Sequence, residues 1–206
     1  MYNGKLYYMN KNNQSEIYDP ELNTWTYWSP PPVGAGDRPC LVTWRDSFIL
    51  IGGSSNPRGV QLYNITANSW STLAQMPPIP RVGHACAQLP SSNPNRFLIL
   101  GGEAERQHAA IYDAGTDYWT TAAKSTSGRA YSNLSVLGNR VFAIGGHDGG
   151  KVLDTVEEYL VSQDKWEAKG VKLPGARHVQ SAVTLSVDLF DSANLYTPLE
   201  EGCIGV

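Results

Sequence analysis

Short apolar runs that end in a pair of glycines recur along the chain. Three runs have this form: residues 48–51 before Gly52 and Gly53, residues 97–100 before Gly101 and Gly102, and residues 141–144 before Gly145 and Gly146. An apolar run of this length, bounded by turn residues, is typical of a buried strand. Glycine permits a positive φ and a close backbone approach, so we expect each strand to end at its glycine pair.

Each glycine pair is followed by a tyrosine and, seven residues later, by a tryptophan. These aromatic pairs are Tyr63 and Trp70, Tyr112 and Trp119, and Tyr159 and Trp166. A fourth pair, Tyr18 and Trp25, follows an apolar run at residues 6–9 that lacks the glycines. We expect the rings to lie on two neighbouring strands and to be buried between repeats, as packing residues.

The repeat has a period of 44 to 49 residues, measured from Gly52 to Gly101 to Gly145 or from each tryptophan to the next. Repeats of this length with four short strands each are typical of propeller blades. The sequence therefore predicts an all-β fold. The expected strands of the first two repeats are residues 6–9, 16–18 and 24–28, then 39–44, 47–51, 60–63 and 69–72.

The glycine pair, the tyrosine and the tryptophan at these distances resemble the kelch repeat, over residues 4 to 185. The resemblance implies a kelch-type β-propeller. We expect this domain to span residues 1–185, with a non-repeat tail at 186–206. Its blades are expected at residues 1–28 together with 178–185, and at 38–72, 81–121 and 129–168.

Two arrangements of these blades fit the sequence. Residues 178–185 match the first strand of a repeat, whereas the chain begins with the second strand of one. Pairing the two ends would close a ring of four four-stranded blades without a free strand edge. Otherwise the chain is a fragment of a larger propeller, and most propellers of this family have more blades.

The composition excludes some classes of partner. The net charge is −3, charged residues make up 17% of the chain, and no block of one charge occurs, so nucleic acid is not expected as a partner. No apolar run is long enough to insert into a membrane. The three cysteines are too few for a disulfide framework or a zinc site, and we expect Cys40 and Cys86 to be small buried strand residues. No metal or other cofactor is predicted. A cytoplasmic location is favoured, with secretion left open.

The loops on one rim of the propeller are the candidate binding surface. An antiparallel meander places the start of each blade's first strand beside the end of its second strand. The loops that lead into the first strands and the loops that follow the second strands therefore share this rim. The candidate residues are Arg38, Ser54, Asn56, Arg58, Arg81, Arg106, Arg129, His147, Asp148 and Arg177. One arginine at each first strand would suit an acidic peptide, because guanidinium binds carboxylate with two hydrogen bonds. Alternatively, these arginines belong to the repeat itself and hold neighbouring loop carbonyls.

The resemblance favours a non-catalytic module that binds a protein or peptide. Kelch propellers often recruit substrates for ubiquitin ligases, but the other domains of such adaptors are absent here, so that role is an analogy. A secreted or cell-surface protein binding glycans or matrix is the alternative, and a small-molecule enzyme at the channel mouth is a third. The copper site of kelch-type oxidases cannot be carried over, since no cysteine lies beside a tyrosine with a suitable histidine pair.

Overall fold

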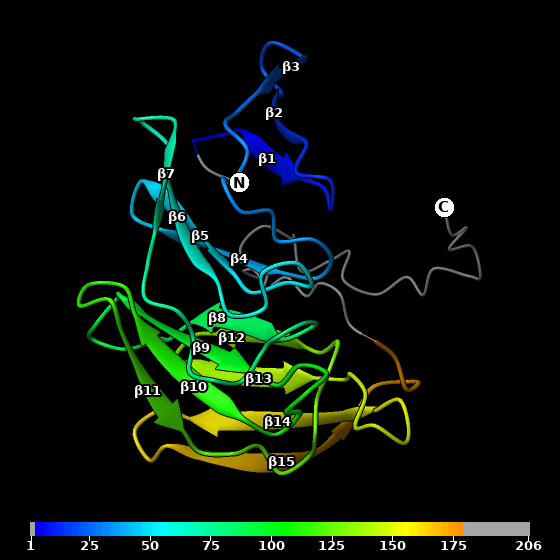
Figure 1. Cartoon of the computed structure of the whole chain (residues 1–206). Coiled ribbons are helices and arrows are strands. Elements are labelled where there is room, and N and C mark those ends of the chain that lie inside the picture. Colours follow the sequence, from blue (N-terminus) through cyan, green and yellow to red (C-terminus); the bar gives the residue numbers. More distant parts are fainter. Residues whose placement is uncertain (1–2, 179–206) are drawn as a thin grey trace.

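The computed structural model describes residues 3–178, and all of the regular secondary structure in this range is β-strand. The described part therefore has no helix that could cross a membrane. In this described range, fifteen strands form four antiparallel sheets, which follow one another in chain order (Figure 1). The predicted all-β architecture is confirmed.

Each sheet is one blade, with its strands side by side in sequence order. Blade 1 has three described strands, β1 (Leu6–Met9), β2 (Ser15–Asp19) and β3 (Thr24–Tyr27). Blade 2 consists of β4 (Cys40–Trp44), β5 (Ser47–Ile51), β6 (Val60–Asn64) and β7 (Ser69–Thr72). Blade 3 consists of β8 (Ala85–Gln88), β9 (Arg96–Leu100), β10 (Ala109–Asp113) and β11 (Tyr118–Ala122). Blade 4 consists of β12 (Asn133–Leu137), β13 (Arg140–Ile144), β14 (Thr155–Leu160) and β15 (Lys165–Lys172).

The strands of the first two repeats lie within two residues of their predicted bounds. The first strands of blades 2, 3 and 4 are neighbours, because β4 contacts β8 and β8 contacts β12. Residues 179–185, which were expected to complete blade 1, and the tail at 186–206 lie outside the described residues. Closure of the ring therefore stays a prediction.

The glycine pairs receive the start of the next blade. The amides of Gly53 and Gly102 donate to the carbonyls of Arg81 and Arg129, at 3.1 and 3.0 Å. Gly101 has a φ of +71°, and a β-carbon there would lie 1.8 Å from the Arg129 carbonyl oxygen. A side chain at this position would push the blades apart, which explains why the repeat carries glycine.

A recurrent set of hydrogen bonds joins each blade to the segment that leaves the preceding blade. In blade 3, the Tyr112 hydroxyl and the amide of Ala74 both donate to Oδ1 of Asp117, at 2.6 and 2.8 Å. The Trp119 indole then donates to the Ala74 carbonyl at 2.9 Å. One linker residue is thus held by both its amide and its carbonyl, and we call this arrangement the interblade clamp.

The clamp recurs on both sides of blade 3. In blade 2, Tyr63, Asn68 and Trp70 hold Ser29, and in blade 4, Tyr159, Asp164 and Trp166 hold Ala123. The tyrosine and tryptophan rings are cross-strand neighbours, with centroids 4.7 to 5.2 Å apart. The repeated aromatic pair is therefore a polar connector as well as a buried apolar surface.

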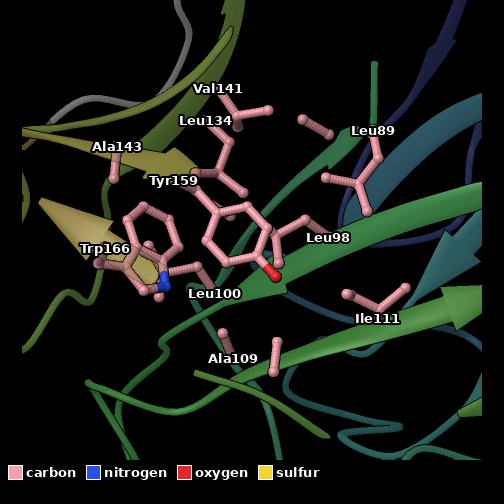
Figure 2. Packing of buried hydrophobic residues seen from close by; sticks show 13 residues of the cluster. Leu89, Leu98, Leu100, Ala109, Ile111, Leu134, Val141, Ala143, Tyr159 and Trp166 are labelled. Carbon is pink, nitrogen blue, oxygen red and sulfur yellow. The ribbon is translucent and has the colours of Figure 1, made fainter. Parts of the chain in front are cut away.

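Apolar side chains fill the space between successive blades. Figure 2 shows Tyr159 and Trp166 of blade 4 against Leu98 and Leu100 of blade 3, with Leu134 and Val141 nearby. Between blades 1 and 2, the indole of Trp28 meets the ring of Tyr63 edge-on, at a centroid distance of 4.5 Å. These interfaces form three separate apolar clusters rather than one central core.

The cysteines of blades 2 and 3 do more than the sequence predicts. Cys40 on β4 and Cys86 on β8 form a disulfide, with their α-carbons 6.2 Å apart. The expectation that they are free, buried strand residues is wrong. Each cysteine lies at or next to the start of the first strand of its blade. Because β4 lies directly beside β8, the propeller geometry brings the two cysteines together.

Candidate functional site

The first strands of blades 2, 3 and 4 begin side by side at one edge of the structure. The Gly83 amide donates to the Arg38 carbonyl at 3.2 Å, and the Tyr131 amide donates to the Gly83 carbonyl at 2.7 Å. All three residues have a positive φ, of +59°, +67° and +55° in chain order. Arg38, Gly83 and Tyr131 therefore occupy equivalent positions, and their backbones form a continuous hydrogen-bonded ladder across the three blades.

A cavity opens at this ladder, and we call it the mouth cavity. Its volume is about 340 Å³, and it is lined by Arg38, Pro39, Gly83, His84, Tyr131, Ser132 and His178. Glycine leaves room for a neighbouring ring, because a β-carbon at Gly83 would lie 2.4 Å from the Tyr131 ring. The structure thus places an aromatic residue and an arginine at the entrance.

Arg38, Tyr131 and Glu103 form a polar triad at that entrance. Nη1 of Arg38 donates to Oε1 of Glu103 at 2.9 Å and to the Tyr131 hydroxyl at 2.8 Å. The hydroxyl in turn donates to the same carboxylate oxygen. The guanidinium also lies over the Tyr131 ring, 4.5 Å from its centroid. The Arg38 and Glu103 side chains are 56% and 44% exposed, so the ion pair faces solvent.

Two of the predicted rim arginines are buried instead. Arg81 is 3% exposed, and its Nη1 donates to the carbonyls of Gly101 and His108. Arg129 is fully buried, bonds the carbonyls of Gly145 and Thr155, and forms an ion pair with Glu157 at 2.8 Å. The expectation of an exposed arginine on every blade is therefore wrong for these two, and the alternative applies to them, because they bond loop carbonyls of their own blades.

The offset between arginines explains the error. The backbone carbonyls of Arg81 and Arg129 accept hydrogen bonds from glycine amides of the preceding blade. The carbonyl of Arg177 accepts in the same way from the Gly146 amide. Arg38 instead occupies the place of Gly83 and Tyr131, two residues later in the repeat. If blades 2 and 4 are aligned by their glycine pairs, Arg38 falls level with Tyr131 rather than with Arg129.

The other predicted rim residues lie in different surroundings. Arg58 donates to the Met76 carbonyl through two nitrogens, at 2.9 and 3.1 Å, and Arg177 is exposed. Arg106 and Asp148 lie together in a separate hollow of about 370 Å³ with Glu105, His108 and Lys124. Among the predicted rim residues, Arg38 thus lines the mouth cavity, whereas Arg106 and Asp148 line a different depression.

The polar loop residues are largely engaged in turns. Ser54 accepts from the Asp37 amide at 2.8 Å, and the Asn56 backbone closes the tight turn from Gly53 to Gly59. Asp148 accepts from the amides of Gly150 and Lys151, and these bonds lower the pKa of its carboxyl. The His147 ring lies 5.7 Å from that of His178, which connects it to the mouth cavity.

His84 is a lining residue that sequence reasoning did not select. It is 7% exposed, and neither ring nitrogen has a hydrogen-bond partner among the described residues. Burial, together with the nearby positive charge of Arg81, lowers the pKa of His84 to about 3. The imidazole therefore stays neutral at physiological pH.

Sequence comparisons identify the repeat. A family model described as "Kelch motif" matches residues 128–168, which are the strands and loops of blade 4. Kelch-like protein 25 of Xenopus tropicalis is 31% identical over 75% of this chain and 26% of its own length. The chain is a kelch-repeat protein. Human Kelch-like protein 23 is 26% identical over 82% of this kelch chain and 30% of its own. The kelch chain thus spans less than a third of the length of either relative.

A solved structure shows the same kelch-type propeller fold. The structure titled "Structure of YjhT" superposes with a TM-score of 0.71 at 18% identity. The match covers 85% of this kelch chain and 65% of the other one. The predicted kelch-type propeller is therefore confirmed as a fold. Within residues 3–178, no group of three histidine, cysteine or acidic side chains is arranged to hold a metal ion.

Proposed function

We propose that this kelch chain is a non-catalytic protein-interaction module, and that the mouth cavity binds an acidic side chain of a partner polypeptide. The observation that carries the proposal is the exposed Arg38, which a backbone ladder, a hydroxyl and an aromatic ring fix at the cavity entrance. A positioned guanidinium loses little freedom when a ligand binds, which favours affinity.

A partner carboxylate could replace Glu103 at Arg38 at little energetic expense. Ion pairs between exposed side chains contribute about 0–1 kcal/mol, and this pair is about half exposed on both sides. An incoming carboxylate would accept from Arg38 and from the Tyr131 hydroxyl, the two groups that now contact Glu103. Glu103 therefore acts as an internal competitor for acidic ligands.

The kelch-like names of the relatives support a binding role without specifying a ligand. Of the four predicted arginines, Arg81 and Arg129 are buried and Arg177 is exposed but does not line the mouth cavity, so the proposal rests on Arg38. His178 stacks on the Tyr131 ring at a centroid distance of 5.3 Å and adds a second nitrogen-bearing side chain near the entrance. This single fixed arginine is the centre of the proposed contact.

The test uses an array of acidic peptides, each paired with an amide version in which every Asp and Glu is replaced by Asn or Gln. We expect selected acidic peptides to bind, as measured by fluorescence anisotropy, and their amide versions to bind at least about tenfold more weakly. Arg38→Ala should abolish this preference. Glu103→Gln should strengthen acidic binding several-fold, because it removes the competitor.

Arg45→Ala is the matched control, since Arg45 is an exposed arginine at the β4–β5 turn, outside the mouth cavity. This variant should bind like the unmodified protein. Equal binding of acidic and amide peptides, or acidic binding that survives Arg38→Ala, would show that the proposed contact is incorrect.

A further inference from the structure

The depression that contains Arg106 and Asp148 lies between blades 3 and 4, and we call it the charged hollow. Its volume is about 370 Å³, and it is lined by two cationic residues, Arg106 and Lys124, and by two acidic residues, Glu105 and Asp148. The walls come from the β9–β10 loop, from the linker that follows β11 and from the β13–β14 loop. None of these segments adjoins either end of the described range.

The two carboxylates of the charged hollow already have partners within the chain. The Glu105 carboxylate lies 2.8 Å from Nδ1 of His108. Oδ1 of Asp148 accepts hydrogen bonds from the amides of Gly150 and Lys151, at 2.8 and 2.9 Å. Neither acidic side chain is therefore bonded to the cations that line the same hollow.

The two cations, by contrast, lack partners. Among residues 3–178, neither the Arg106 guanidinium nor the Lys124 ammonium makes a hydrogen bond or an ion pair. Nε of Arg106 is moreover buried without an acceptor. Buried donors that lack an acceptor are rare in native proteins, because leaving them unbonded costs free energy. Both cations are thus available to a ligand that enters the charged hollow.

Arg106 is held in place by its packing against two glycines. A β-carbon at Gly128 would lie 2.9 Å from Cβ of Arg106, and one at Gly149 would lie 3.3 Å from its Nη1. The Arg129 amide also donates to the Arg106 carbonyl, at 2.7 Å. The side chain thus extends from blade 3 to the β13–β14 loop of blade 4. A guanidinium positioned in this way loses little freedom when it binds an anion.

The linker that carries Lys124 is also fixed. Nε2 of Gln107 donates to the carbonyls of Ser125 and Thr126, both at 3.2 Å. The Thr126 amide donates to Oε2 of Glu157 at 2.8 Å. The backbone of Lys124 therefore starts from a defined place beside the charged hollow, and its exposed side chain can turn towards a ligand.

The two carboxylates decide which anion the charged hollow favours. A ligand carboxylate brings one negative charge and two oxygens, and it would be opposed by Glu105 and Asp148. A phosphate monoester brings a charge of about −1.5 to −2 and three acceptor oxygens. It can therefore accept from the guanidinium and from the ammonium at the same time. This chemistry favours a phosphoryl group over a carboxylate.

We propose that the charged hollow binds a phosphorylated side chain of a partner polypeptide, whose phosphoryl oxygens accept from Arg106 and Lys124. The choice of a polypeptide rests on the proposed function, because the charged hollow and the mouth cavity share two segments of chain. Glu103 of the polar triad precedes Arg106 by three residues, and Tyr131 follows Gly128 by three. A polypeptide bound at the mouth cavity would therefore pass close to the charged hollow.

Phosphoserine peptides without Asp or Glu test the proposal, each paired with its unphosphorylated form and measured against the full chain by fluorescence anisotropy. We expect selected phosphopeptides to bind at least about tenfold more tightly than their unphosphorylated forms. Arg106→Gln should abolish this preference. Asp148→Asn should strengthen phosphopeptide binding several-fold, because it removes an opposing charge and keeps an oxygen for the two loop amides.

Lys151→Gln is the matched control, since Lys151 is an exposed cation of the same β13–β14 loop that does not line the charged hollow. This variant should bind phosphopeptides like the unmodified protein. A thermal melt should show that Arg106→Gln is folded, because this side chain makes no bond that the substitution removes.

The outcome is separable from that of the acidic-peptide experiment, because these peptides carry no carboxylate side chain. Arg38→Ala should leave the preference for phosphoserine intact, even if acidic binding at the mouth cavity fails. Equal binding of phosphorylated and unphosphorylated peptides, or a preference that survives Arg106→Gln, would overturn the proposal. Inorganic phosphate that binds as tightly as the phosphopeptides would also overturn it, by showing a site for free phosphate.

Discussion

At the residue scale, the interblade clamp depends on a side chain that the repeat pattern hides. Asn68, Asp117 and Asp164 each accept from a tyrosine hydroxyl and from a linker amide. All three have a positive φ, between +46° and +52°. Asparagine and aspartate tolerate this conformation better than other residues with a β-carbon, and their short side chains reach back to the backbone. A single residue thus supplies both the positive φ of the turn and the oxygen that accepts the two hydrogen bonds of the clamp.

Asp117→Ala should therefore destabilise the protein by about 2–4 kcal/mol, through two lost hydrogen bonds and backbone strain. Asp117→Asn is the control, because blade 2 uses asparagine at this place, and its loss should stay below about 1 kcal/mol. Urea denaturation of both variants measures the free energy of unfolding. Equal losses would show that the side-chain oxygen is not what holds the linker.

His84 should make stability depend on pH. Its pKa is about 3 in the folded protein and 6.5 when exposed. Below pH 6.5 the unfolded chain binds a proton that the folded protein does not, so the free energy of unfolding falls by up to about 1.4 kcal/mol per pH unit. This loss should extend from pH 6.5 towards pH 3.

The measurement is denaturation between pH 8 and pH 5. His84→Gln should flatten the curve below pH 6.5, whereas His147→Gln, at a half-buried loop position, should leave the slope in place. A slope that persists in His84→Gln would assign the pH dependence to other groups.

At the element scale, the first strands of the blades are the structural axis of the described part. They are short, they lie next to each other, and their starts form the ladder at the mouth cavity. The β4–β8 contact is also covalent, through Cys40 and Cys86. The disulfide lies two residues from Arg38 and from His84, so it fixes the part of the ladder on which the proposed binding site depends.

Reduction of this disulfide should destabilise the protein. It closes a loop with a sequence separation of 46 residues, and cross-links of this length contribute about 2–4 kcal/mol, mainly by restricting the unfolded chain. Thermal melts of oxidised protein with and without reductant measure the effect. The double variant Cys40→Ala and Cys86→Ala should melt early and be insensitive to reductant. A melting temperature of the unmodified protein that ignores reductant would contradict the prediction.

At the scale of the whole molecule, the blades form a row in which each contact is local. Within residues 3–178, three apolar clusters, three complete clamps and one disulfide connect neighbouring blades, and the mouth cavity is lined by residues of blades 2, 3 and 4.

The sequence alone determined the blade plan. Spacing between Gly52, Tyr63 and Trp70, repeated in the later copies, specified strands, turns and the buried aromatic pair, because these depend on local backbone geometry and on periodic burial. These features are local in the chain, so a pattern can encode them. Of the residues that line the mouth cavity, the sequence selected Arg38 alone as a candidate for binding.

Only the tertiary structure decided which polar residues face solvent. Arg81 and Arg129 look like Arg38 in sequence, yet a shift of two residues buries them on loop carbonyls and leaves Arg38 at the cavity. The same holds for Cys40 and Cys86, whose pairing depends on β4 lying beside β8. The disulfide joins positions 46 apart, and the side-chain contacts of Arg81 and Arg129 span 16 to 28 positions, so no local pattern specifies either outcome.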